Sequence, residues 1–106
     1  MKVLVVDIGG TNVKIRATGQ AEPRRFPSGP TLTSRRMVSG VKQLAGEWKY
    51  GVVSIGYPGL VLKGRVASDP HNLASGWVGF DFAAAFGRPV RTMNDAAMQA
   101  LGSYQG

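Results

Sequence analysis

The sequence is short of the residues that most often build disulfides and metal sites. It contains no cysteine and a single histidine, His71, so disulfides, thiolate metal sites and histidine clusters are excluded within its 106 residues. No apolar run approaches the roughly 20 residues that a bilayer-spanning helix needs, and no signal-peptide pattern precedes Lys2. We therefore expect a cytoplasmic protein without a membrane partner.

Acidic residues are also scarce. Six Asp and Glu stand against thirteen Lys and Arg, which gives a net charge of +7 and favours anionic partners. The basic residues are scattered rather than gathered in one block with aromatics, which argues against nucleic acid and leaves phosphorylated small molecules and polyphosphate. The length fits one domain with a modest core.

Apolar periodicity predicts a layered α/β protein with helices packed on a mixed sheet. Short apolar or alternating runs between glycine and proline turns predict strands at 2–6, 13–17, 24–26, 51–55, 60–62, 65–67 and 89–93. Helices are predicted from residue 31 or 33 to about 49, over 80–86 and over 94–101. One apolar stripe of the first helix should pack on the sheet, and it consists of Met37, Val38, Val41, Leu44, Ala45 and Trp48.

Several residues of the later loops are predicted to have structural roles. Asp69 is a loop residue, Asp81 a helix cap and Trp77 a packing residue. His71 has no second histidine or cysteine to share a metal with.

The most informative motif follows the first predicted strand, which ends at the carboxylate of Asp7. Gly9 and Gly10 would let the backbone approach an anion and aim its N–H groups at it, while Thr11 adds a hydroxyl and Lys14 a positive charge. Asp7 would then face a cation such as Mg²⁺, which prefers oxygen ligands and keeps several waters. The alternative is a tight hairpin turn with a capping aspartate.

A second carboxylate, Asp95, lies just beyond the last predicted strand. Ligands collect at the carboxyl ends of strands in open α/β sheets, so Asp7 and Asp95 would share one cleft if the first and last strands are parallel neighbours. The alternative is that Asp95 simply caps the following helix.

Four motifs, in this order, resemble the amino-terminal lobe of ROK-family sugar kinases. They are Asp7-Ile8-Gly9-Gly10-Thr11, Gly56-Tyr57-Pro58-Gly59, His71-Asn72-Leu73 before Trp77, and Asn94-Asp95-Ala96 with Leu101-Gly102. The family belongs to the hexokinase and actin-like ATPase superfamily, whose lobes have a ribonuclease H-like fold. The resemblance covers essentially the whole chain, and the segment 57–104 looks most like the polyphosphate glucokinase branch.

The resemblance implies a division of labour in phosphoryl transfer to glucose or a related hexose. On the donor side, Asp7 would organise Mg²⁺ through water, while the terminal phosphate of ATP or polyphosphate would be held by Gly9, Gly10, Thr11 and Lys14. On the sugar side, Asp95 would be the general base that takes the proton of the primary hydroxyl. Sugar contacts would come from Asn94, Asp95 and the backbone of Gly59, and Asn72 has either a sugar contact or a structural loop role.

The resemblance also implies that a second lobe is missing from residues 1–106. The lobe alone should have little or no kinase activity, and its exposed cleft side or final helix should associate with a second lobe or with another copy. Two other functions remain, a sugar-sensing regulatory module of the same family and a non-catalytic phosphate-binding domain. The regulators carry a DNA-binding helix-turn-helix before the first strand, whereas here the strand begins at Lys2.

Overall fold

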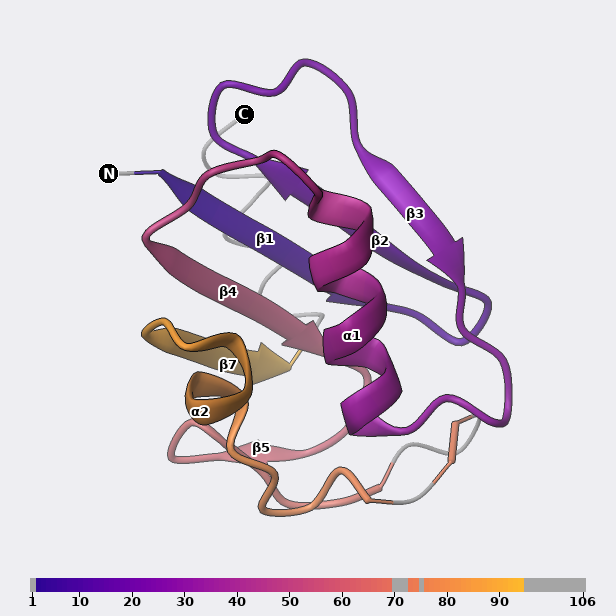
Figure 1. The fold of residues 1–106 in the computed structure, drawn as a ribbon. Helices are drawn as coiled ribbons and strands as arrows, with labels where there is room; N and C mark the ends of the chain where they lie inside the picture. Colours follow the sequence, from indigo (N-terminus) through magenta and orange to yellow (C-terminus); the bar gives the residue numbers. More distant parts are fainter. Residues whose placement is uncertain (1, 70–72, 75, 95–106) are drawn as a thin grey trace.

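The computed structural model describes residues 2–69, 73–74 and 76–94, and within them five strands form one mixed sheet. The strands lie in the order β3-β2-β1-β4-β7 (Figure 1). Their bounds are Arg24–Pro27 (β3), Asn12–Ala17 (β2), Val3–Ile8 (β1), Val52–Tyr57 (β4) and Val90–Asn94 (β7). β1, β4 and β7 run parallel, while β2 is antiparallel to both β1 and β3. The predicted mixed α/β fold is confirmed.

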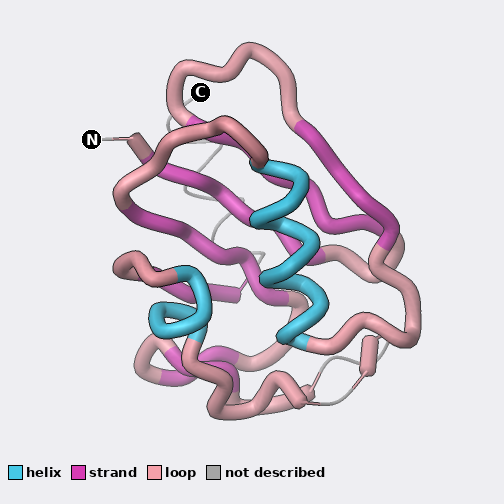
Figure 2. The backbone as a smooth tube through the Cα atoms, viewed as in Figure 1, coloured by secondary structure: helices cyan, strands magenta, loops and turns pink. Residues whose placement is uncertain are grey.

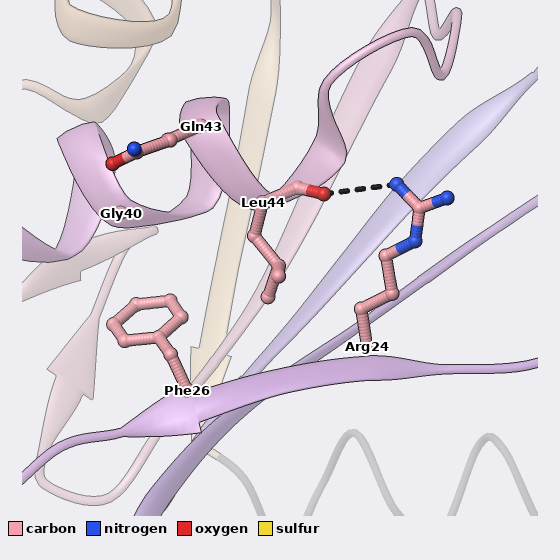
Figure 3. Close-up of a pocket in the computed structure, with 5 residues that line it drawn as sticks. All are labelled: Arg24, Phe26, Gly40, Gln43 and Leu44. Carbon is pink, nitrogen blue, oxygen red and sulfur yellow. Dashed lines mark hydrogen bonds between the residues drawn. The ribbon is translucent and has the colours of Figure 1, made fainter.

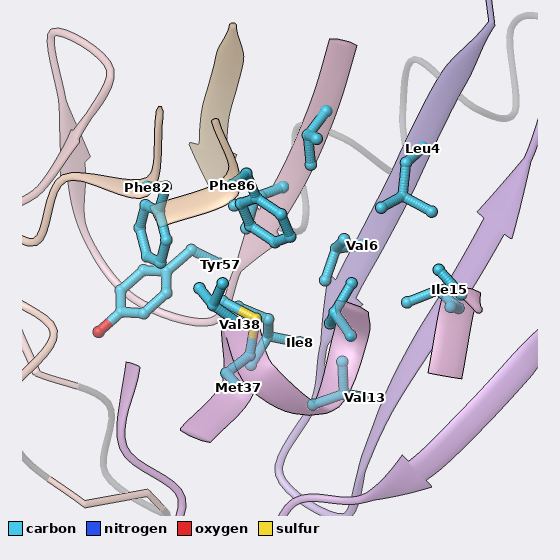
Figure 4. Packing of buried hydrophobic residues seen from close by; sticks show 14 of the residues in the cluster. Leu4, Val6, Ile8, Val13, Ile15, Met37, Val38, Tyr57, Phe82 and Phe86 are labelled. Carbon is cyan, nitrogen blue, oxygen red and sulfur yellow. The ribbon is translucent and has the colours of Figure 1, made fainter. Parts of the chain in front are cut away.

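Two helices, α1 (Ser34–Ala45) and α2 (Phe82–Phe86), cover one face of this sheet (Figures 1 and 2). The even-numbered residues of β1 point into the core against α1, because side chains alternate along a strand. Val3 and Val5 lie on the other face and are only half-buried, so β1 is fully buried on one face alone. Figure 4 shows the packed side of the core, which includes Leu4, Val6, Ile8, Val13, Ile15, Met37, Val38, Tyr57, Phe82 and Phe86.

The first helix is shorter than its apolar stripe predicts. It begins after Thr33, whose hydroxyl accepts a hydrogen bond from the Arg36 N–H at 3.2 Å. It ends at Gly46, which has a positive φ of 53° and donates its N–H to the Lys42 carbonyl at 3.1 Å. Trp48 therefore lies beyond the helix, although it is buried as predicted.

The other predicted elements differ mainly at their ends. The predicted hairpin around Lys63 and Gly64 is confirmed by β5 (Val61–Leu62) and β6 (Arg65–Val66), and both turn residues have positive φ. Asp81 caps α2 by accepting a hydrogen bond from the Ala84 N–H. The predicted helix start at Asn94 is wrong, because Asn94 is the last residue of β7, and the rest of that predicted helix lies outside the described residues.

In the described part of the chain, neither helix is long and apolar enough to cross a membrane.

Candidate active site

The carboxyl ends of the three parallel strands meet at one edge of the sheet. Asp7 in β1 is in register with Gly56 in β4, and Gly56 is in register with Met93 in β7. The cleft predicted to be shared by Asp7 and Asp95 requires that the first and last strands are parallel neighbours. β1 and β7 are parallel, but they are not neighbours, because β4 lies between them. Gly56 has no side chain, so no side chain of β4 lies between Asp7 and Met93. These two residues are two strand spacings apart, which is roughly 10 Å.

Asp95 and Asn72 lie outside the described residues, as does His71. In the sequence, Asp95 directly follows Asn94, the last residue of β7.

The turn between β1 and β2 contains three of the four predicted phosphate-binding residues, Gly9, Gly10 and Thr11. The Gly9 N–H donates to the Asn12 carbonyl at 2.9 Å, and a Cβ at position 9 would lie 3.0 Å from that same oxygen. Glycine is therefore needed here for the close approach of two backbone segments. Gly10 and Thr11 are exposed at the tip of the turn.

Ser28, a residue that the motifs do not include, holds this turn from the side of β3. Its hydroxyl donates to the Gly9 carbonyl at 2.8 Å, and its N–H donates to the Thr11 carbonyl at 2.9 Å. The sequence carries one signal for this contact. If the strands predicted at 13–17 and 24–26 pair as neighbours, residue 28 falls beside the turn.

Lys14 lies in a row of charges on the sheet face that carries Asp7. It is directly opposite Asp7 in β1 and directly opposite Arg25 in β3. Side chains directly opposite each other on antiparallel strands point to the same face. This Asp7–Lys14–Arg25 row therefore has one acid and two bases, a balance that favours an anion.

Asp7 is the carboxylate that the sequence predicts to face a metal ion. Among the described residues no group of three His, Cys, Asp or Glu side chains could hold a metal ion. Mg²⁺ does not need such a cage, because it commonly binds one or two carboxylates together with waters and substrate phosphates. The carboxylate at the end of β1, beside the turn that the sequence predicts to bind phosphate, fits that donor set.

On the other side of the edge, the segment after β4 is fixed by three hydrogen bonds. The Tyr57 hydroxyl donates to the Ser68 carbonyl at 2.6 Å, and the Leu60 N–H donates to the Ser68 hydroxyl at 3.0 Å. The Asn94 side-chain amide donates to the Gly59 carbonyl at 2.9 Å, which links the end of β7 to this segment. Asn94 and Gly59, both predicted to contact sugar, are thus brought together.

Tyr57 is completely buried, and its ring centroid lies 5.6 Å from that of Trp77. Burial, and secondarily the charge of Asp69, raise the pKa of Tyr57 above its ordinary value. Trp77 is fully buried, as expected of the predicted packing residue, and its backbone N–H donates to the Asp69 carboxylate at 3.1 Å. Buried, hydrogen-bonded aromatic residues therefore pack behind Gly59.

A separate groove lies between β3 and α1 (Figure 3), lined by Arg24, Phe26, Gly40, Gln43 and Leu44. The guanidinium of Arg24 donates to the Leu44 carbonyl at 3.0 Å and to the Glu47 carboxylate at 2.9 Å, and it lies 4.3 Å from the centroid of Trp48. The hydrogen bond and charge of Arg24 lower the pKa of Glu47. Arg24 therefore links β3 to the C-terminal end of α1. We assign the groove a packing role.

Neither a family model nor a curated protein matches this chain. Solved structures do match it, and they define the fold as that of the ROK and actin-like ATPase lobes. A protein of Cytophaga hutchinsonii assigned as a sugar kinase matches with a TM-score of 0.76 and 25% identity, over 98% of this chain and 39% of that one. A ROK-family glucokinase from Streptomyces griseus, solved with glucose and AMPPNP, has a TM-score of 0.76 and 22% identity, over 98% of this chain and 36% of its own.

A ROK hexokinase from Thermus thermophilus also matches, with a TM-score of 0.65 and 20% identity over 91% of this chain. The chain thus spans little more than a third of the length of these sugar kinases, 36% to 39%. At this level of identity the likeness defines the fold, and the active-site roles must be argued from the residues.

Proposed function

We propose that residues 1–106 form the amino-terminal lobe of a ROK-family sugar kinase, of the polyphosphate glucokinase branch. The enzyme transfers a phosphoryl group from polyphosphate or ATP to the primary hydroxyl of glucose. One observation carries the proposal: a carboxylate, a phosphate-type turn and the Asn94–Gly59 contact lie along one edge of a sheet that sugar kinases share. That edge is where ligands bind in open α/β folds.

The donor phosphate would lie against the turn of Gly9, Gly10 and Thr11. Lys14 would neutralise part of its charge, and Arg25 extends the cationic row away from Asp7. Asp7 would hold Mg²⁺, which lowers the charge of the transferring group when it is bound. Positioning and charge neutralisation supply most of the rate enhancement in phosphoryl transfer.

The sugar would lie on the β4 and β7 side of the same edge. Asp95 follows β7 directly, and we assign it the role of general base, accepting the proton of the attacking hydroxyl. Asn94 would accept or donate to sugar hydroxyls while its amide anchors Gly59. Asn72 would add a contact from the loop before Trp77.

Catalysis would also need groups from outside residues 1–106. The solved sugar kinases are more than twice as long as this chain, and a cleft between two lobes excludes water from the transferring phosphate. We therefore expect the chain alone to transfer phosphate very slowly, and to associate with a second lobe or a second copy through its cleft side.

The test is Asp95→Asn in the complete enzyme that contains this chain. Loss of a general base should lower kcat by about 10²–10⁴-fold, while calorimetry still detects glucose binding. Asp81→Asn is the matched control, since asparagine caps a helix as well as aspartate does and Asp81 caps α2. Parallel assays with ATP and polyphosphate identify the donor. Undiminished turnover by Asp95→Asn, or wild-type protein that binds no hexose, contradicts the proposal.

A further inference from the structure

We propose that Ser28 is a positioning residue that aims the N–H groups of Gly10 and Asn12 at the donor phosphate. The inference rests on the proposed function, since it assumes that the turn between β1 and β2 binds phosphate. It assigns a role to a residue outside all four motifs, on the connection between β3 and α1.

Two carbonyls of the turn point toward Ser28. The Gly9 carbonyl accepts from the Ser28 hydroxyl at 2.8 Å, and the Thr11 carbonyl accepts from the Ser28 N–H at 2.9 Å. In a two-residue hairpin the Gly9 carbonyl would accept from the Asn12 N–H instead. The serine hydroxyl has therefore drawn this carbonyl out of the turn.

The planarity of the peptide bonds fixes the directions of the neighbouring N–H groups. The peptide bonds of the described residues are all trans, so each carbonyl and the next N–H point in opposite directions. With the Gly9 and Thr11 carbonyls turned toward Ser28, the N–H groups of Gly10 and Asn12 point away from it. Two N–H groups held in this way on one side of a tight turn form an anion-binding concavity.

The N–H group of Gly9 differs from those of Gly10 and Asn12, because it has an acceptor within the turn. The Gly9 N–H already donates to the Asn12 carbonyl at 2.9 Å, so the part of Gly9 in binding is to allow the close approach rather than to donate. The phosphate contacts are expected at Gly10, Thr11 and Asn12.

Ser28 itself is held stiffly. Asn12 is opposite Pro27 in the β2–β3 pairing, which places Ser28 beside the turn. Pro27 and Pro30 restrict the backbone on either side, and Gly29 has a φ of 78° that favours glycine. A serine on such a support fixes the orientation of the turn before phosphate arrives, which reduces the ordering cost of binding.

The experiment measures binding of inorganic tripolyphosphate to the 106-residue chain, with Mg²⁺, by following backbone amide resonances. In the wild type, the resonances of Gly10 and Asn12 should shift most and that of Gly9 little. Ser28→Ala should weaken binding about three- to tenfold, the effect of one lost hydrogen bond, and Ser28→Thr should restore it. Ser39→Ala, on the exposed face of α1, is the matched control and should leave binding unchanged.

The outcomes separate the two proposals. If Ser28→Ala binds tripolyphosphate as tightly as wild type, or if Ser28→Thr fails to restore binding, the role of Ser28 is overturned while the phosphate-binding turn remains. If wild-type protein binds no tripolyphosphate, the turn itself is misassigned and both proposals fall. Thermal unfolding of each variant shows whether weaker binding merely reflects lost stability, and a loss that tracks the melting temperature also overturns the proposal.

Discussion

Substituting Gly59 with alanine should test whether the segment after β4 is fixed as the structure shows. A Cβ at this position would lie 2.7 Å from Cε2 of Tyr57 and 3.2 Å from the Ser68 hydroxyl oxygen. Ordinary carbon–carbon contacts are roughly 3.5–4.0 Å, so one neighbour must move. Tyr57 has little freedom to move, because its ring is fully buried and its hydroxyl is bonded to the Ser68 carbonyl at 2.6 Å.

The cost of Gly59→Ala is therefore that of an overpacked core. Such insertions destabilise proteins by about 1–3 kcal/mol, and we expect about 2 kcal/mol because the ring cannot withdraw without losing a hydrogen bond. For a domain of this size that corresponds to a fall in Tm of roughly 8–15 °C. The substitution should also shift the Gly59 carbonyl that accepts from Asn94, and so weaken sugar binding in the complete enzyme.

Urea unfolding of Gly59→Ala, Tyr57→Leu and the double variant measures this directly. Leucine removes the ring atom that clashes, so the double variant should be at least about 1 kcal/mol more stable than the sum of the single losses predicts. A loss below about 0.5 kcal/mol for Gly59→Ala, or additivity within about 0.3 kcal/mol, would refute the reasoning.

Three further predictions concern Tyr57 and two arginines. The folded protein raises the pKa of Tyr57 above its ordinary value of 10.0, so the contribution of Tyr57 to stability is fully present below about pH 10 and falls above it, by up to about 1.4 kcal/mol per pH unit. Tyr57→Phe should flatten this fall in urea unfolding, and an unchanged slope would be the contrary result. Arg25→Gln should raise stability by about 0.2–1 kcal/mol by removing the repulsion from Lys14, yet weaken tripolyphosphate binding, and unchanged binding would count against the cationic row. Arg24→Lys keeps the charge but loses the flat guanidinium over the ring of Trp48 and should cost about 1 kcal/mol, with an unchanged Tm as the contrary result.

The sequence predicted the strands and hairpins well because their signals are local. Gly9 and Gly10 mark one turn. Lys63 and Gly64 mark another, and the positive φ values of Lys63 and Gly64 are a local property of that turn. The end of α1 was misplaced because Trp48 continues the apolar period of the helix. Gly46, which ends the helix, is visible in the sequence. Apolar periodicity alone could not decide whether the helix ends there or continues to Trp48.

The candidate site was predicted less completely because it depends on strand order. Nothing local shows that β4 lies between β1 and β7, since parallel pairing brings together residues some forty positions apart. Only this strand order shows that Gly56 leaves the space between Asp7 and Met93 without a side chain. Ser28 was missed for a similar reason, because its contact depends on the pairing of β2 with β3.

The Asp7–Lys14–Arg25 row has one negative and two positive charges, a balance that would favour a bound anion. Lys14 and Arg25 are directly opposite each other, an arrangement that destabilises an antiparallel pair, and one carboxylate cannot compensate two cations at once. A phosphate at the adjacent turn would remove that cost, and Mg²⁺ bound at Asp7 would occupy the carboxylate and increase the demand for negative charge. Donor phosphate and metal should therefore bind cooperatively at this edge, since each supplies the charge that the other leaves uncompensated.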